Sequence, residues 1–194
     1  VLQFLWINVI MDTFAALALC SEPPRKALML MPPKRRDESI VTRSMLRTLV
    51  STAAFYAVVM LGLLWLMGGT PEAPGLFAGG PWLAGEDGSL TGLTARQATI
   101  FFTTYVLFQV WNLFNARSVR TDASGFRDPL SNRPLLLIAL LIIALQAVIV
   151  TVGGELFQVQ PLALVDWLWI VVGTASVVVF AELVRRVRLL FGER

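Results

Sequence analysis

Two oxygen-bearing side chains, Asn8 and Asp12, lie four residues apart in an apolar stretch that runs from Val1 to Cys20. Four residues make about one turn of an α-helix, so in a helix the amide oxygen and the carboxylate share one side. A carboxylate at the centre of a bilayer costs about 3 kcal/mol on insertion scales, so we expect Asp12 to face protein, water or a cation. Hard cations such as Ca²⁺ prefer such oxygen ligands. The spacing therefore favours a cation site.

The alternative interpretation is structural. Asn8 could bond a neighbouring helix, and Asp12 could be held protonated or paired with a basic residue. Two side chains cannot complete a calcium shell of about six to eight oxygens, so a cation site needs further groups, some of them backbone carbonyls where a helix unwinds. The chain has no histidine and one cysteine, Cys20, which excludes disulfide frameworks, zinc sites and imidazole relays within it.

A second polar group lies in the segment from Gln97 to Ala116. Gln109, Asn112 and Asn115 follow one another at three-residue spacing and form a ridge on an otherwise apolar helix. Gln109 lies deepest in the segment and is the third candidate metal ligand, although amide bonds between membrane helices would also account for the ridge. For Gln146, packing between helices is a sufficient explanation.

The elements that must position these groups are membrane-spanning helices. The chain is 56% hydrophobic and 15% charged, so its apolar surface exceeds what one small soluble core could bury. Five segments have about the length that crosses a hydrocarbon core as a helix. We therefore predict an all-α membrane protein, a bundle of five transmembrane helices spanning residues 1–194, with spans at about 1–20, 44–67, 97–116, 134–152 and 162–183.

The basic residues predict the orientation of the bundle. Apart from Arg96, every Lys and Arg lies within Arg25–Arg47, Arg117–Arg133 or Arg185–Arg194, and these stretches alternate with loops that lack them. By the positive-inside rule the basic stretches are cytoplasmic, so the carboxyl terminus is cytoplasmic too. The clusters flank apolar spans and lack interleaved aromatics, which favours a topological role and contact with lipid over nucleic-acid binding.

The chain also resembles a known family. Residues 5–19, which read LWINVIMDTFAALAL, and the Glu22-Pro23-Pro24 that follows resemble the sixth transmembrane helix of P-type calcium ATPases of the plasma-membrane type. Residues 108–117, FQVWNLFNAR, are similar to the eighth helix of that family, and residues 149–154 to the ninth helix and its exit. The resemblance spans nearly the whole chain.

The resemblance implies that the five helices are helices six to ten of an ATP-driven pump that exports Ca²⁺ from the cytosol across a plasma or inner membrane. Asn8 and Asp12 would supply calcium ligands, and Gln109 would be a weaker associate. The remaining ligands would come from amino-terminal helices of the same pump. ATP and Mg²⁺ would bind in its cytoplasmic domains, because no Asp-Lys-Thr-Gly phosphorylation motif occurs here.

Two positions depart from the two-site, reticulum-type pumps. Met11 stands where those pumps have a ligating threonine, and Gln109 stands where they have a glutamate. Because a thioether is a poor ligand for a hard ion and an amide lacks charge, these departures predict one transported Ca²⁺ per cycle. The competing hypotheses are a P-type pump for another cation, a secondary transporter, and a membrane scaffold.

Overall fold

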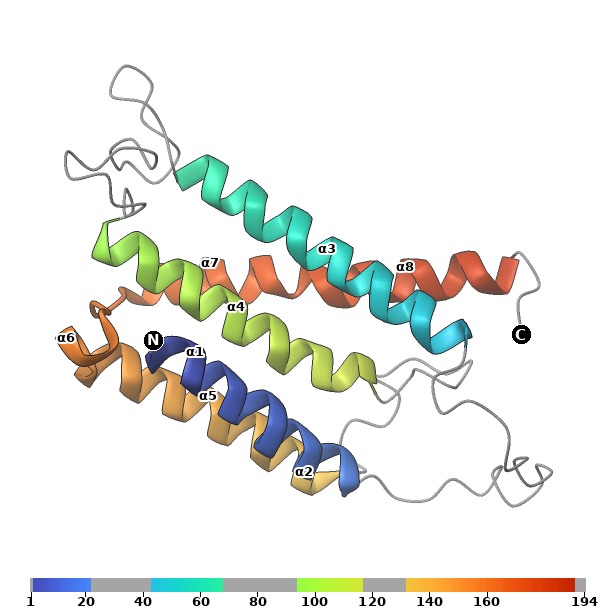
Figure 1. Ribbon diagram of the computed structural model, residues 1–194, viewed down its shortest axis with the longest axis horizontal. Helices are drawn as coiled ribbons and strands as arrows, with labels where there is room; N and C mark the ends of the chain where they lie inside the picture. The colour runs from blue at the N-terminus through green and yellow to red at the C-terminus, as the bar shows by residue number, and fades with distance from the viewer. Residues whose placement is uncertain (1, 22–42, 68–93, 117–131, 191–194) are drawn as a thin grey trace.

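The computed structural model describes residues 2–21, 43–67, 94–116 and 132–190, without the side chains of residues 11, 12, 43, 44 and 188–190. All regular elements in these residues are helices, and they form one elongated bundle (Figure 1). Most of the two basic loops, 25–42 and 117–131, and the Gly- and Pro-rich stretch 68–93 lie outside the described residues. The prediction of an all-α membrane helix bundle is confirmed.

The first helical run is interrupted in its middle. It consists of α1 (Leu2–Val9), a π-helical segment η1 (Ile10–Ala15) and α2 (Ala16–Cys20), which follow one another without a loop. A π-helix is rare, and it often marks a functional site when it interrupts an α-helix. The Asn8–Asp12 turn therefore lies at an irregularity that the apolar pattern of the sequence did not indicate.

The central helix of the described bundle is α4 (Ala95–Ala116). It contacts α2 and four other helices, which are α3 (Arg43–Met67), α5 (Arg133–Val152), α7 (Leu164–Thr174) and α8 (Ser176–Leu190). It begins with a capping box, because the Thr94 hydroxyl accepts from the Gln97 backbone N–H while the Gln97 side chain accepts from the Thr94 N–H. More than half of its residues are buried, including Gln97, Thr99, Thr103, Thr104 and Gln109. The helix that carries the polar ridge is therefore the one most enclosed by the others.

Hydrogen bonds join α4 to its neighbours on several sides. The Tyr56 hydroxyl of α3 (Arg43–Met67) donates to the Phe108 carbonyl at 2.8 Å. The Trp111 indole donates to the Thr174 hydroxyl of α7 at 3.0 Å, and an Arg96–Asp166 ion pair at 2.6 Å joins the starts of α4 and α7. These contacts attach α4 to α3 and α7.

The helix α5 (Arg133–Val152) lies beside the first helical run (Figure 1). Pro134 in its first turn and the Asn132 side chain, which accepts from the Leu135 N–H at 2.9 Å, fix its start. A short turn of helix, α6 (Gly154–Phe157), follows after Gly153, and Gly154 adopts a positive φ of 43°. Glycine tolerates this conformation without steric cost, so the chain can reverse here.

The last helical run is interrupted at Ala175. It is divided into α7 (Leu164–Thr174) and α8 (Ser176–Leu190). At the junction the Thr174 hydroxyl donates to the carbonyls of Ile170 and Val171, a back-bonding pattern that bends helices. In α8, Glu182 pairs with Arg185 and Arg186, which accounts for its charge in an apolar run.

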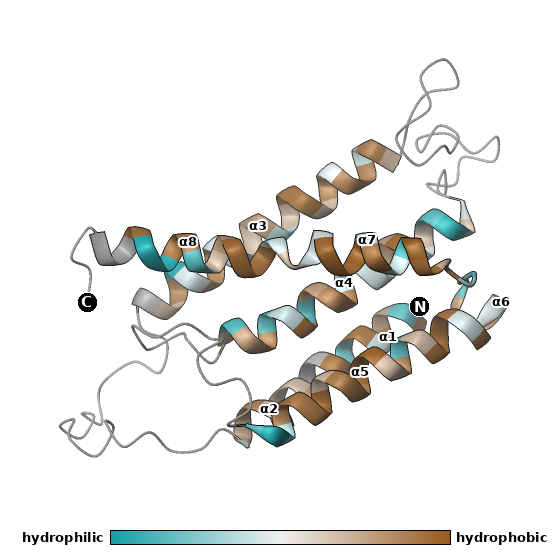
Figure 2. Cartoon of the chain, turned by 180° about the vertical axis from the view of Figure 1, so that it is seen from behind, coloured by the Kyte–Doolittle hydropathy of each residue, from teal (hydrophilic) through white to brown (hydrophobic). Residues whose placement is uncertain are grey.

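Within the residues that the structure describes, four helical runs are long and apolar enough to cross a membrane: Leu2–Cys20, Met45–Met67, Arg133–Val152 and Leu164–Val187. Figure 2 shows the long apolar stretches of α3, α5 and α7, whereas α4 is interrupted by polar residues. With 22 residues α4 is about 33 Å long, enough to span a hydrocarbon core. That it forms the fifth span stays a prediction, because its amides and hydroxyls lower its hydropathy.

Candidate cation site

The predicted ligands Asn8 and Asp12 lie at the entry to and inside the π-helical segment. Asn8 is the second-to-last residue of α1, and Asp12 is the third residue of η1. In a π-helix the backbone hydrogen bonds skip one residue more than in an α-helix, so the turn is wider and the side-chain spacing changes. The side chains of Met11 and Asp12 lie outside the described part of the structure, so the backbone alone locates this part of the site.

Asn8 lies on the exposed surface of the described bundle. Its neighbours Phe4, Leu5 and Val9 are exposed with it, Phe4 by 74%. Apolar side chains on this surface suit lipid or another helix, but an amide facing hydrocarbon is unfavourable. This surface of the first helical run is therefore suited to contact with further protein.

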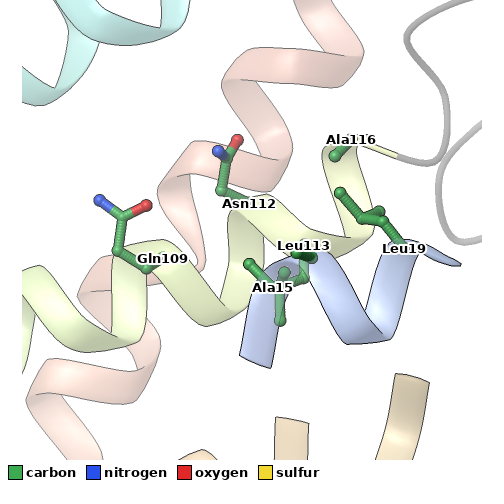
Figure 3. Close-up of a pocket in the computed structure, with 7 residues that line it drawn as sticks. Ala15, Leu19, Gln109, Asn112, Leu113 and Ala116 are labelled. Atoms are coloured by element: carbon green, nitrogen blue, oxygen red, sulfur yellow. The ribbon is translucent and has the colours of Figure 1, made fainter. Parts of the chain in front are cut away.

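Gln109 is buried, with 6% of its surface exposed, and lies beside the first helical run. It lines a pocket of about 410 Å³ together with residues of η1, α2 and α4: Ala15, Ala16, Leu19, Asn112, Leu113 and Ala116. Figure 3 shows Gln109 and Asn112 extending from the same side of α4, whereas Ala15 and Leu19 of the first run lie beside Leu113 and Ala116. Small alanine side chains leave this space open next to two amides.

The structure thus brings Gln109 to the segment that directly follows Asp12, but not to Asn8, which is absent from the pocket lining. Among the described residues there is no group of three or more His, Cys, Asp or Glu side chains that could hold a metal ion. The oxygen donors located here are amides, and amides are ligands for hard cations that contribute no charge.

The sequence pattern did not predict the hydrogen bonds that attach the first helical run to the elements that follow it. Three hydrogen bonds fix it to the following elements: Gln3 donates to the Phe157 carbonyl at 2.7 Å, the Trp6 indole donates to Gln146 at 3.0 Å, and Ser21 donates to the Asn132 side chain at 3.2 Å. The signal in the sequence was Gln146, because an amide in the middle of an apolar span needs a hydrogen-bond partner on another helix.

Comparison with known proteins adds to this geometry. Residues 1–187 match the sequence model of a family described as cation transporting ATPase, C-terminus. The chain is 34% identical over 170 residues to plasma membrane calcium-transporting ATPase 3 of Homo sapiens, which covers 86% of this chain and 13% of that protein. It is 33% identical over 170 residues to plasma membrane calcium-transporting ATPase 1 of Mus musculus, with the same coverage.

A further relative is plasma membrane calcium-transporting ATPase 2 of Oreochromis mossambicus, at 31% identity over 169 residues, which is 87% of this chain and 14% of that protein. The chain therefore spans about one seventh of the length of these curated relatives.

Proposed function

The chain belongs to the family of cation-transporting ATPase carboxyl-terminal regions, and on this premise we propose that it is the membrane part of an ATP-driven P-type pump that exports Ca²⁺ from the cytosol. Its relatives bear the name of plasma membrane calcium-transporting ATPases. The observation that carries the proposal for the site is the coincidence of a π-helical interruption with the Asn8–Asp12 turn. A wider turn at a pair of oxygen donors suits ion coordination inside a membrane.

We assign three residues to the cation site: Asn8, Asp12 and Gln109. Asp12 would supply the negative charge, Asn8 a neutral oxygen one turn away, and Gln109 a further amide from α4. The exposed surface around Asn8 would be covered by amino-terminal helices of the same pump, which would contribute the remaining ligands. ATP and Mg²⁺ would bind in the cytoplasmic part of the pump, because the three residues of the cation site cannot transfer a phosphoryl group.

In this proposal the chain crosses the membrane five times, and its carboxyl terminus lies in the cytoplasm. The ends of α2, α4 and α8 lie at the same end of the bundle as the starts of α3 and α5 (Figure 1). Arg47, Arg133, Arg185 and Arg186 lie near this end, and Arg96 near the other, where it pairs with Asp166. Because most of these basic residues lie where α2, α4 and α8 end, the positive-inside rule supports a cytoplasmic position for that end of the bundle.

The test of the proposed ion is activation of the full-length pump. In inside-out vesicles that contain the purified protein, micromolar free Ca²⁺ is expected to activate formation of the phosphoenzyme from ATP, with Mn²⁺, Na⁺ and K⁺ compared at matched ionic strength. Activation by another cation and not by Ca²⁺ would identify the first competing hypothesis. A protein that forms no phosphoenzyme with any cation but moves one ion by using the gradient of another would be a secondary transporter.

The stoichiometry follows from the charge available at the site. Because Met11 and Gln109 offer no carboxylate, we expect one Ca²⁺ to be transported for each ATP hydrolysed. Uptake of ⁴⁵Ca²⁺ and release of inorganic phosphate, measured in the same tightly sealed vesicles, give this ratio. A ratio near two, with passive leak subtracted, contradicts the assignment of a single site.

A further inference from the structure

One buried side chain connects the two helices that carry the proposed ligands. Gln146 of α5 accepts a hydrogen bond from the Trp6 indole of α1 at 3.0 Å and donates to the Thr103 hydroxyl of α4 at 3.2 Å. An indole N–H can only donate, so the amide oxygen must face Trp6 and the amide nitrogen Thr103. The orientation of the glutamine is therefore determined by its two partners.

The two partners occupy equivalent places relative to the candidate ligands. Trp6 precedes Asp12 by six residues, and Thr103 precedes Gln109 by six residues. The two helices run in the same direction through the bundle (Figure 1). Six residues correspond to about 9 Å along an α-helix. Only the last three residues of the Trp6–Asp12 stretch lie in η1, so a bond that fixes Trp6 and Thr103 at one level also sets Asp12 and Gln109 at close to one level.

The pocket supports the same register independently. The first helical run lines it with Ala15, Ala16 and Leu19, and α4 lines it with Asn112, Leu113 and Ala116. Taken in order, each pair differs by 97 in residue number, which is also the difference between Trp6 and Thr103. Two observations at different depths, a hydrogen-bonded bridge and a shared pocket, therefore give one alignment of the first helical run with α4.

Two of the three members of the bridge are fully buried, and Trp6 is partly buried. Gln146 and Thr103 each have 0% of their surface exposed. A buried amide that loses a partner has no water to replace it, so the cost of breaking the bridge is the cost of an unsatisfied polar group. The bond between Ser21 and Asn132 lies beyond the far end of η1, so the π-helical segment lies between two attachments of the same run to α5.

We propose that Gln146 is a positioning residue for cation binding: by holding Trp6 and Thr103 together, it fixes the register of the first helical run against α4 and thereby sets Asp12 level with Gln109. The inference rests on the proposed function for its effect on calcium. The alignment of the two helices is a separate property, so it can be measured without any ion.

The experiment uses variants of the full-length pump. Gln146→Leu and Thr103→Val are expected to raise the free Ca²⁺ concentration for half-maximal phosphorylation about three- to tenfold, the change expected for one net hydrogen bond. The maximal phosphoenzyme per folded protein stays at the wild-type level. Thr103→Ser keeps the hydroxyl and should keep the wild-type half-maximal concentration, whereas a double variant should shift no further than Gln146→Leu alone, because both changes break one bridge.

The matched control is Thr151→Val in α5. The Thr151 hydroxyl is exposed and donates only to the Ala147 carbonyl of its own helix, so its loss should not change calcium activation. If Gln146→Leu and Thr103→Val reduce only the amount of folded pump and leave the half-maximal concentration unchanged, the positioning role is refuted. Equal shifts for Thr103→Ser and Thr103→Val would also refute it.

Register is measured directly by cross-linking. In a background of Cys20→Ala, a pair of cysteines at Ala15 and Leu113 should form a disulfide rapidly on mild oxidation, because the two positions line one pocket. Gln146→Leu should lower the yield of this disulfide. Unchanged cross-linking overturns the inference. If Ca²⁺ fails to activate the wild-type pump, the proposed function fails, and the cross-link still decides whether Gln146 positions the two helices.

Discussion

Asp12→Asn is expected to abolish calcium-activated phosphorylation of the full-length pump. The substitution keeps the size and one oxygen of the side chain but removes the negative charge that we assign to the site. The other two candidate ligands are neutral, so Asp12 alone among the three attracts the cation by its charge. We expect no phosphoenzyme from labelled ATP at buffered free Ca²⁺ concentrations up to about 100-fold above the wild-type half-maximal value.

A second aspartate in the described bundle provides the control. Asp166 pairs with Arg96 at the end of the bundle where α4 and α7 begin, with N and O atoms 2.6 Å apart. Asp166→Asn makes the same chemical change away from η1, so it should retain calcium activation even if the protein becomes somewhat less stable. Normal activation of the Asp12→Asn pump, at an equal amount of folded protein, would remove Asp12 from the site.

Asn8→Leu is expected to raise the half-maximal Ca²⁺ concentration about 10- to 100-fold while phosphorylation at saturating Ca²⁺ persists. The amide would supply one neutral oxygen, and the loss of one hydrogen-bonding or coordinating group to a charged ligand has about this effect on affinity. The measurement is the same titration, extended to millimolar Ca²⁺ so that the plateau is reached.

Val9→Ala tests whether any substitution on the exposed surface around Asn8 raises the half-maximal Ca²⁺ concentration. Val9 is the next residue on α1, and it is exposed beside Asn8. We expect its truncation to leave the half-maximal concentration within about twofold of wild type, because no oxygen is lost. An equal shift in the two variants would mean that the surface around Asn8 acts through packing against other helices and not through coordination.

Hydropathy alone predicted the fold class, because long apolar runs have few alternatives to membrane helices. The described helical runs cover 2–20, 43–67, 95–116, 133–152 and 164–190. That these runs are five membrane spans stays a prediction. The largest difference from the predicted ends is in the last run, which reaches Leu190 instead of Leu183. Arg185 and Arg186 extend it, since Glu182 pairs with both within one turn of the helix.

The π-helical segment could not be predicted from composition. Ile10–Ala15 contains no proline or glycine, and its residues are compatible with an ordinary α-helix. A wider turn arises where packing against several neighbours is satisfied better by one extra residue, and such a preference depends on tertiary contacts. The interruption at Ala175 is similar, because the hydroxyl of Thr174 forms its bonds only once the helix exists.

The candidate site was partly predictable for a comparable reason. Asn8, Asp12 and Gln109 attract attention because polar groups are rare in apolar spans, and this holds for Gln146 as well. Sequence spacing does not show whether a polar side chain binds a cation or hydrogen-bonds two helices together. It also does not show whether that side chain is exposed or buried. The partners of Gln146 are 43 and 140 residues away along the chain, so the role of this side chain becomes visible only in the folded bundle.

The enclosure of α4 has a consequence for synthesis of the protein. During translation α4 emerges before α5, α7 and α8, the helices that later bury its amides and hydroxyls. A segment with so many polar groups has a weak tendency to leave the translocon for lipid by itself. We expect α4 to be retained next to the insertion machinery until α5 arrives. Gln146 can then accept a hydrogen bond from the Trp6 indole and donate one to the Thr103 hydroxyl. In this sequence of events α4 would enter the bundle together with α5, before α7 and α8 complete its surroundings.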